Sequence, residues 1–75
     1  MTDTSEVDNL KVGEQVEHTV HHIEGERQNI VLNYVDEGCI QVFVYIVEGK
    51  YKNSIQWEKT YKTMEEAKKE YYRFD

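Results

Sequence analysis

Residues 28–47 read QNIVLNYVDEGCIQVFVYIV and include the longest apolar run of the chain, Val42 to Val47. Two runs rich in β-branched and aromatic residues, 28–35 and 39–47, flank the turn sequence at residues 36–38. Strand-forming runs joined by a short turn that contains glycine are typical of a β-hairpin. The stretch therefore predicts two antiparallel strands at the centre of the fold.

Turn signals recur outside this hairpin at similar intervals. The four glycines are spaced 11–13 residues apart, at Gly13, Gly25, Gly38 and Gly49. Residues 54–61 (SIQWEKTY) alternate apolar and polar positions, with Ile55, Trp57 and Tyr61 on one face. This period of two is typical of a half-buried strand. The glycine spacing and the alternation together predict an antiparallel meander.

A helix is predicted after the last strand. Thr63 is a good N-cap residue, and Glu66 three positions later completes a capping box. Apolar residues follow at helical spacing, at Met64, Ala67, Tyr71 and Phe74. We expect Tyr71 and Phe74 to anchor this helix to the sheet face made by Ile40, Val42, Val44 and Ile46.

The start of the chain allows two interpretations. Residues 14–24 fit either a helical stripe or a strand, and we favour a strand because their apolar residues are β-branched. The fold class is α+β in either case: a meander of three to four strands with one C-terminal helix on one face, or αβββα. Residues 1–9 are polar and expected to be flexible, and residues 10–75 form a single domain.

Candidate chemical groups are few. His18, His21 and His22 supply imidazoles, but zinc needs three or four converging ligands, and the sequence does not clearly supply the others. Cys39 follows a turn and lacks a motif that links it to a base. We therefore expect no metal, no cofactor and no catalytic residue, so an enzyme is the least expected class.

Acidic residues flank three of the turns. A meander brings its first and third turns to the same end of the sheet, which would cluster Glu24, Glu26 and Glu48 there. Asp36 and Glu37 would lie at the opposite end. These acidic turns are candidates for binding a partner protein that has a basic surface.

The central hairpin is apolar on both faces, and one short helix covers only one face of a sheet. The second face would expose five apolar residues, Val31, Val35, Phe43, Tyr45 and Val47. Either the N-terminal segment covers this apolar patch, or the patch is the interface of a homodimer or of a partner protein.

Charge is unevenly distributed along the chain. Residues 1–48 have a net charge of −8, whereas residues 49–75 have +2, for a total of −6. A strongly acidic body makes nucleic acid an unexpected partner. One cysteine, no signal peptide and no apolar run long enough to span a membrane favour a cytoplasmic protein without a membrane anchor.

The C-terminal stretch VFVYIVEGKYKNSIQWEKTYKTMEEAKKEYYRF (42–74) resembles the arm-binding domains of phage-type tyrosine recombinases, which place a three-stranded sheet in the DNA major groove. The residues that carry the resemblance are Gly49, Lys50, Lys62, Thr63, Glu66 and Ala67. In size and charge the chain also resembles phage-encoded inhibitors of host defence, including anti-CRISPR proteins and DNA mimics.

The expected function is protein binding. The most specific form of this expectation is an acidic inhibitor that occupies a basic site of a nucleic-acid-handling host protein. The alternative is a nucleic-acid-binding accessory domain that uses the basic, aromatic C-terminal part, as the recombinase resemblance implies.

Overall fold

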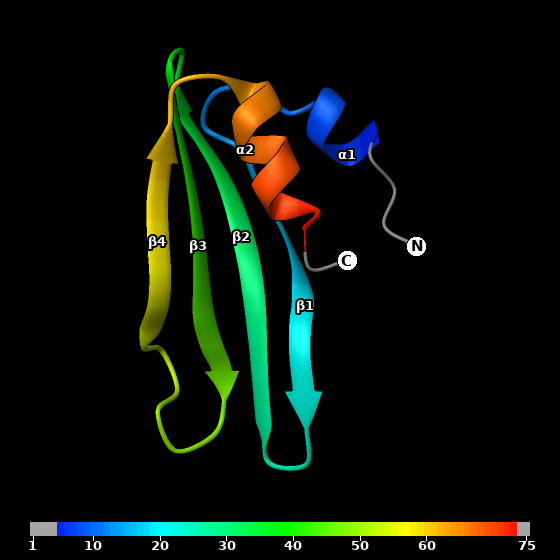
Figure 1. Ribbon diagram of the computed structural model, residues 1–75, viewed down its shortest axis with the longest axis vertical. Helices are drawn as coiled ribbons and strands as arrows, with labels where there is room; N and C mark the ends of the chain where they lie inside the picture. Colours follow the sequence, from blue (N-terminus) through cyan, green and yellow to red (C-terminus); the bar gives the residue numbers. More distant parts are fainter. Residues whose placement is uncertain (1–4, 74–75) are drawn as a thin grey trace.

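The computed structural model describes residues 5–73, with side chains described from residue 7 onward. Its elements are α1 (Ser5–Asp8), β1 (Gln15–Ile23), β2 (Glu26–Asp36), β3 (Cys39–Glu48), β4 (Ile55–Tyr61) and α2 (Met64–Tyr71). The strands form one antiparallel sheet in the order β1-β2-β3-β4 (Figure 1). The predicted four-stranded meander with a C-terminal helix is confirmed, and residues 14–24 contain a strand instead of a helix.

Two glycines close the tight turns between the first three strands. Gly25 and Gly38 have φ angles of 80° and 73°, in the left-handed region that residues with a Cβ atom rarely adopt. The turns between β1 and β2 and between β3 and β4 lie at the lower end of the sheet (Figure 1). The turn between β2 and β3 lies at the upper end, as the meander requires.

The predicted helix cap is present. The Thr63 side-chain oxygen accepts a hydrogen bond from the Glu66 backbone N–H at 3.3 Å, and the Thr63 hydroxyl donates to Glu66 Oε1 at 3.2 Å. Both hydrogen bonds tie the first turn of α2 to the residue that precedes it. The sequence therefore locates the start of α2 correctly.

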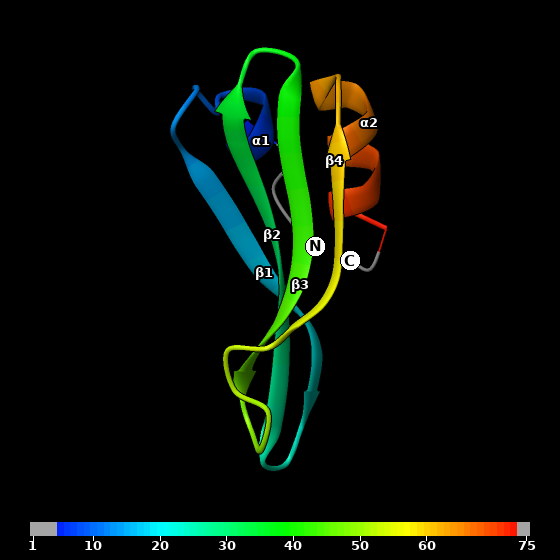
Figure 2. The same ribbon diagram turned by 90° about the vertical axis from the view of Figure 1, so that its left-hand side faces the viewer.

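One buried cluster joins the helices to the sheet. It consists of Val7, Ile30, Leu32, Ile40, Val42, Val44, Ala67 and Tyr71. Ala67 and Tyr71 of α2 are completely buried, and α2 contacts β2, β3 and β4. Figure 2 shows α2 to one side of the twisted sheet. Ile46 is buried outside this cluster, and Phe74, which we expected to anchor the helix, lies outside the described residues.

The N-terminal segment differs from the expectation of a flexible stretch over residues 1–9. Residues 5–8 form α1, whose Val7 is 1% exposed and belongs to the core cluster. Asp8 Oδ1 also lies 2.6 Å from Lys68 Nζ, which links α1 to α2. A single valine in a polar stretch gives too weak a sequence signal to reveal this packing. Residues 1–4 lie outside the described part of the chain.

Irregular pairing changes which residues share a face. The register between β3 and β4 shifts beside Gln56, so that Ile55 lies opposite Tyr45 while Trp57 lies opposite Val44. An extra residue in one strand reverses the alternation of side chains beyond it. The expectation that Ile55 and Trp57 share a face is therefore wrong. Both are well exposed, because β4 is an edge strand.

The sheet is much longer than the helix that accompanies it. The molecule measures 36 × 24 × 17 Å, whereas an eight-residue helix is only about 12 Å long. The two helices lie side by side near the upper end of the sheet (Figure 1). The lower part of the sheet therefore extends beyond α2.

Candidate functional site

The predicted acidic turns meet at the lower end of the sheet, but basic residues accompany them. A Cβ atom added to Gly49 would lie 3.1 Å from the Gly25 carbonyl oxygen, so the first and third turns are in close contact. Glu24 and Glu26 line a shallow hollow there together with Lys50 and Tyr51. Glu48 pairs in register with Arg27. This end of the molecule therefore carries mixed charge.

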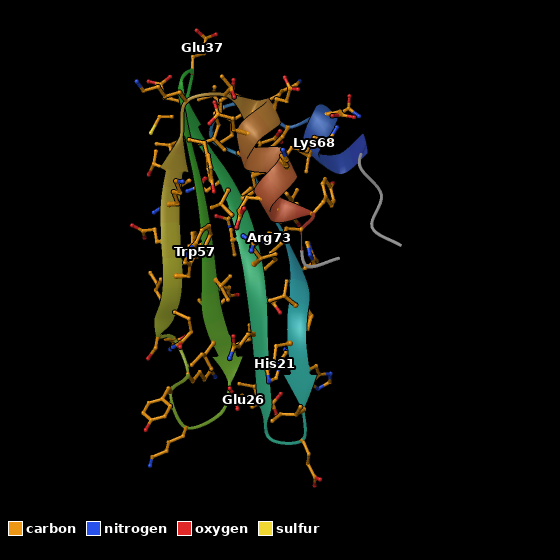
Figure 3. All side chains as sticks on the ribbon, viewed as in Figure 1. His21, Glu26, Glu37, Trp57, Lys68 and Arg73 are labelled. Atoms are coloured by element: carbon orange, nitrogen blue, oxygen red, sulfur yellow. The ribbon has the colours of Figure 1, made fainter. Side chains whose placement is uncertain are left out.

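The other acidic turn stands apart. The Asp36 carboxylate accepts a hydrogen bond from the Glu37 backbone N–H at 2.8 Å, which stabilises the turn itself. Glu37 lies at the upper tip of the molecule, far from Glu26 at the lower end (Figure 3). The acidic turns therefore form two separate sites.

A second candidate surface is a sheet face that we call the Phe43 face. Its three rows cross all four strands, and residues opposite one another in antiparallel strands point to the same side. The rows are Gln15, Asn33, Gln41 and Thr60; Glu17, Val31, Phe43 and Glu58; and Thr19, Asn29, Tyr45 and Ile55. The twelve residues include two carboxylates, two aromatic rings and no lysine or arginine.

Hydrogen bonds fix the polar part of this face. The Tyr45 hydroxyl donates to Glu17 Oε2 at 2.8 Å, and the Asn29 amide donates to the same oxygen at 3.2 Å. The Thr19 hydroxyl donates to Asn29 Oδ1 at 2.9 Å. Because Tyr45 is on β3 and Glu17 is on β1, the Tyr45 side chain reaches across β2. The Glu17 carboxylate is thereby held in a defined orientation on an exposed strand.

The predicted apolar patch is less apolar and less exposed than its sequence suggests. Val31 lies on β2, which the Tyr45–Glu17 hydrogen bond crosses, and is only 2% exposed. Val35 and Val47 lie where the register of β2 and β3 shifts, so neither has a partner in the ladder. Phe43 and Tyr45 are half-buried, with ring centroids 6.0 Å apart. The two rings remain at the centre of the face, next to Val31 and Ile55, and the other eight residues of the three rows are polar.

The hydrogen bond to Glu17 raises the pKa of Tyr45 above its ordinary value of 10.0, and burial raises it further. Arg27 opposes this shift weakly. A raised pKa in the folded state means that this contribution to stability is fully present below pH 10.0 and is lost as the pH rises through the pKa of folded Tyr45.

We therefore predict that the pKa of Tyr45 lies above its ordinary value of 10.0, and that Glu17→Gln lowers the pKa of Tyr45. Carbon-13 NMR of the tyrosine Cζ atoms resolves each titration. An unchanged Tyr45 titration in the variant would contradict the hydrogen bond, whereas Glu14→Gln serves as a control that leaves Tyr45 untouched.

A groove of about 480 Å³ opens on the opposite side of the sheet, beside the end of α2. Its lining comes from all four strands and from α2, with Val20, His21, Gln28, Val44, Gln56, Trp57, Glu70 and Arg73. Figure 3 shows Trp57, His21 and Arg73 approaching this region from different elements. An apolar floor with amide and charged edges suits an apolar side chain of a partner.

Basic residues of β4 and α2 also come together. Lys59, Lys69 and Arg73 line one hollow, but Glu66 and Glu70 line it as well. Arg73 Nη1 lies 3.2 Å from Glu70 Oε1, so its charge is partly balanced. The basic residues of the C-terminal part therefore do not form a continuous positive surface.

The histidines have separate surroundings. The His18 ring meets the edge of the Tyr71 ring, with centroids 4.5 Å apart. The register shifts between Thr19 and His21, so His21 follows His18 on the core side and His22 lies on the other face. Across residues 5–73, no three His, Cys, Asp or Glu side chains converge as a metal site would require. Cys39 is a half-buried free thiol.

Comparisons with known proteins found no matching family model, curated protein or solved structure. No helix within the described part of the chain has the length and apolar composition needed to cross a membrane.

Proposed function

We propose that this protein is a small acidic protein-binding domain, and that the Phe43 face is its binding surface. One observation carries the proposal. Glu17 and Glu58 lie at the two ends of the row that contains Phe43, and the three rows hold no lysine or arginine, although Arg27 lies beside them near Tyr45. Ala67 and Tyr71 of α2 belong to the core cluster with Val42 and Val44, which supports the assignment of the Phe43 face to a partner.

The composition of the face defines the partner. Neighbouring strands lie about 4.8 Å apart, so the two glutamates are separated by about 14 Å across four strands. A partner with basic side chains at this separation would meet both carboxylates while its apolar parts contact Phe43 and Tyr45. Arginine suits both roles, because its guanidinium pairs with carboxylates and stacks on aromatic rings.

The same charges argue against a homodimer through this face. Two copies placed face to face would bring four carboxylates into one interface, against one Arg27 from each copy beside the three rows. Like charges brought together in an interface are destabilising. A different protein with a basic surface is therefore the partner that we propose. An inhibitor of a nucleic-acid-handling protein is the most specific form of this function.

Titration of the protein with oligo-arginine and, separately, with short duplex DNA tests the proposal. We expect oligo-arginine to bind. Its affinity should fall as the salt concentration rises, because salt screens exposed charges beyond about 8 Å at physiological ionic strength. We expect duplex DNA not to bind, because carboxylates accompany the basic residues of β4 and α2.

The opposite pattern would favour the alternative function. Tight, salt-sensitive DNA binding that is lost on changing Lys59 and Lys69 would indicate a nucleic-acid-binding accessory domain. In that case the hollow between β4 and α2 would be the binding surface, and the Phe43 face would have no part in it.

A further inference from the structure

The edge strand β4 is a second surface where a partner can bind. β4 has β3 as its single neighbour in the sheet, so alternate N–H and C=O groups along its outer side have no strand partner. Five consecutive residues, 57–61, pair regularly with β3. β1, the other edge, also pairs regularly over five residues, 15–19, before its register shift between Thr19 and His21. Of the two edges, β4 is the one that carries the tryptophan.

We propose that β4 is a docking edge for an extended segment of a partner protein, which adds to the sheet as a fifth, antiparallel strand. Antiparallel addition continues the pattern of every existing pair in this sheet. Main-chain hydrogen bonds supply affinity in such complexes, and alternate side chains supply specificity.

The side chains of β4 specify what the added strand carries. Trp57, Lys59 and Tyr61 point to the side of the core cluster, because they pair with Val44, Val42 and Ile40. Glu58 points to the Phe43 face. Opposite charges in facing positions stabilise a strand pair, and apolar residues pair with aromatic ones. The partner strand therefore places an acid opposite Lys59, a base opposite Glu58 and apolar residues opposite Trp57 and Tyr61.

A second copy of this chain fits the edge poorly. When two copies pair through β4 in a two-fold symmetric, antiparallel way, the same sheet face of both copies points to the same side. The residue at the centre of the pair then lies opposite the same residue of the second copy. The regular stretch has Glu58 and Lys59 near its middle. Centring the pair on either residue places like charges opposite each other, which is destabilising. The charge pattern of β4 thus disfavours these two pairings, and sedimentation distinguishes a different chain from a pair of copies centred on Thr60, which would place Glu58 opposite Lys62.

Trp57 gives the edge a built-in reporter. It is the single tryptophan of the chain, it is 37% exposed, and it lines the groove with Val44. An apolar side chain of the added strand opposite Trp57 would cover the exposed part of the indole. Tryptophan fluorescence therefore reports on binding at this edge or in the groove beside it, and hydrogen exchange in β4 separates the two.

The test uses two cyclic β-hairpin peptides whose outer strands read Ile-Thr-Glu-Lys-Ile and Ile-Thr-Lys-Lys-Ile. In antiparallel addition the third residue of each strand lies opposite Lys59. We expect the glutamate hairpin to shift Trp57 fluorescence to shorter wavelength and to slow amide hydrogen exchange in β4. The lysine hairpin should bind about threefold to tenfold more weakly, because its third residue repels Lys59.

This preference runs against the overall charge of −6, which by itself favours the more basic hairpin. The Lys59→Glu variant should reverse the preference between the two hairpins, whereas Lys62→Glu, just beyond the strand, should leave it unchanged. Equal binding of both hairpins to the wild-type protein, or binding without slower exchange in β4, would overturn the proposal.

Two further outcomes are decisive. If β4 amides are already protected at high protein concentration and sedimentation shows a dimer, the occupant is a second copy and the proposal is wrong. Glu58 belongs to both proposed surfaces, so the residues that separate them are Lys59 and Glu17. A Glu17→Gln variant that binds oligo-arginine more weakly but keeps the hairpin preference would support two independent surfaces.

Discussion

Replacing Tyr71 with alanine is expected to lower the free energy of unfolding by about 3–5 kcal/mol. Tyr71 is the largest completely buried side chain, and it joins α2 to the core residues of β2 and β3. Its ring also meets those of His18 and Tyr72, at centroid distances of 4.5 and 5.0 Å. Truncation leaves a cavity where α2, β1 and the two central strands of the sheet meet.

A domain of this size has a total stability of roughly 5 kcal/mol, so Tyr71→Ala should unfold much of the population at room temperature. Urea unfolding followed by circular dichroism measures the change. Tyr51→Ala is the matched control, because Tyr51 is 62% exposed and its truncation should leave the midpoint almost unchanged. Equal midpoints for the two variants would contradict the placement of Tyr71 in the core.

Reversing the charge of both glutamates of the Phe43 face is expected to have the largest effect on binding. Glu17→Lys together with Glu58→Lys should weaken oligo-arginine binding about tenfold to a hundredfold at low salt. Two attractions then become two repulsions, and exposed charge pairs contribute up to about 1 kcal/mol each. Both side chains are exposed, but Glu17→Lys also removes the hydrogen bonds from Tyr45 and Asn29, so the melting temperature of the variant should fall below that of the wild-type protein while the domain stays folded.

The matched control is Glu24→Lys together with Glu37→Lys, which makes the same change in net charge at the two ends of the sheet. Both residues are exposed in turns and were predicted from the sequence to bind a partner. We expect this control to change the logarithm of the dissociation constant for oligo-arginine by less than half as much as the Glu17→Lys, Glu58→Lys variant does. If the turn variant loses more affinity than the face variant, the acidic turns are the binding site.

The sequence predicts the architecture well because local signals agree with each other. Glycine turns, β-branched runs and the Thr63 cap each act over a few residues, and each places its element correctly. The tight turns at Gly25 and Gly38 also explain why β1, β2 and β3 are neighbours. Such features need no knowledge of long-range packing.

Register shifts account for what the sequence does not predict. An extra residue near Gln56 separates Ile55 from Trp57, and the shift after Thr19 moves His22 away from His18. Period-two alternation contains no sign of where such a residue will be inserted. The residues beyond each shift therefore lie on the opposite sheet face from the one that simple alternation predicts.

The polar network of the Phe43 face was missed for a related reason. Glu17 and Asn29 are unremarkable residues in separate strands, and their contact with Tyr45 exists only once three strands are in register. The tight turns could have supplied that register, since Gly25 and Gly38 set which residues of neighbouring strands lie opposite each other. Val7 was missed because one apolar residue does not establish a pattern.

The most direct test of the binding surface is to map amide chemical shifts of the protein during titration with oligo-arginine. Our account predicts that the largest changes occur on the Phe43 face, at Glu17, Phe43, Tyr45 and Glu58, and that Glu24 and Glu37 change little. Changes concentrated in the acidic turns, or spread evenly over all exposed carboxylates, would contradict it.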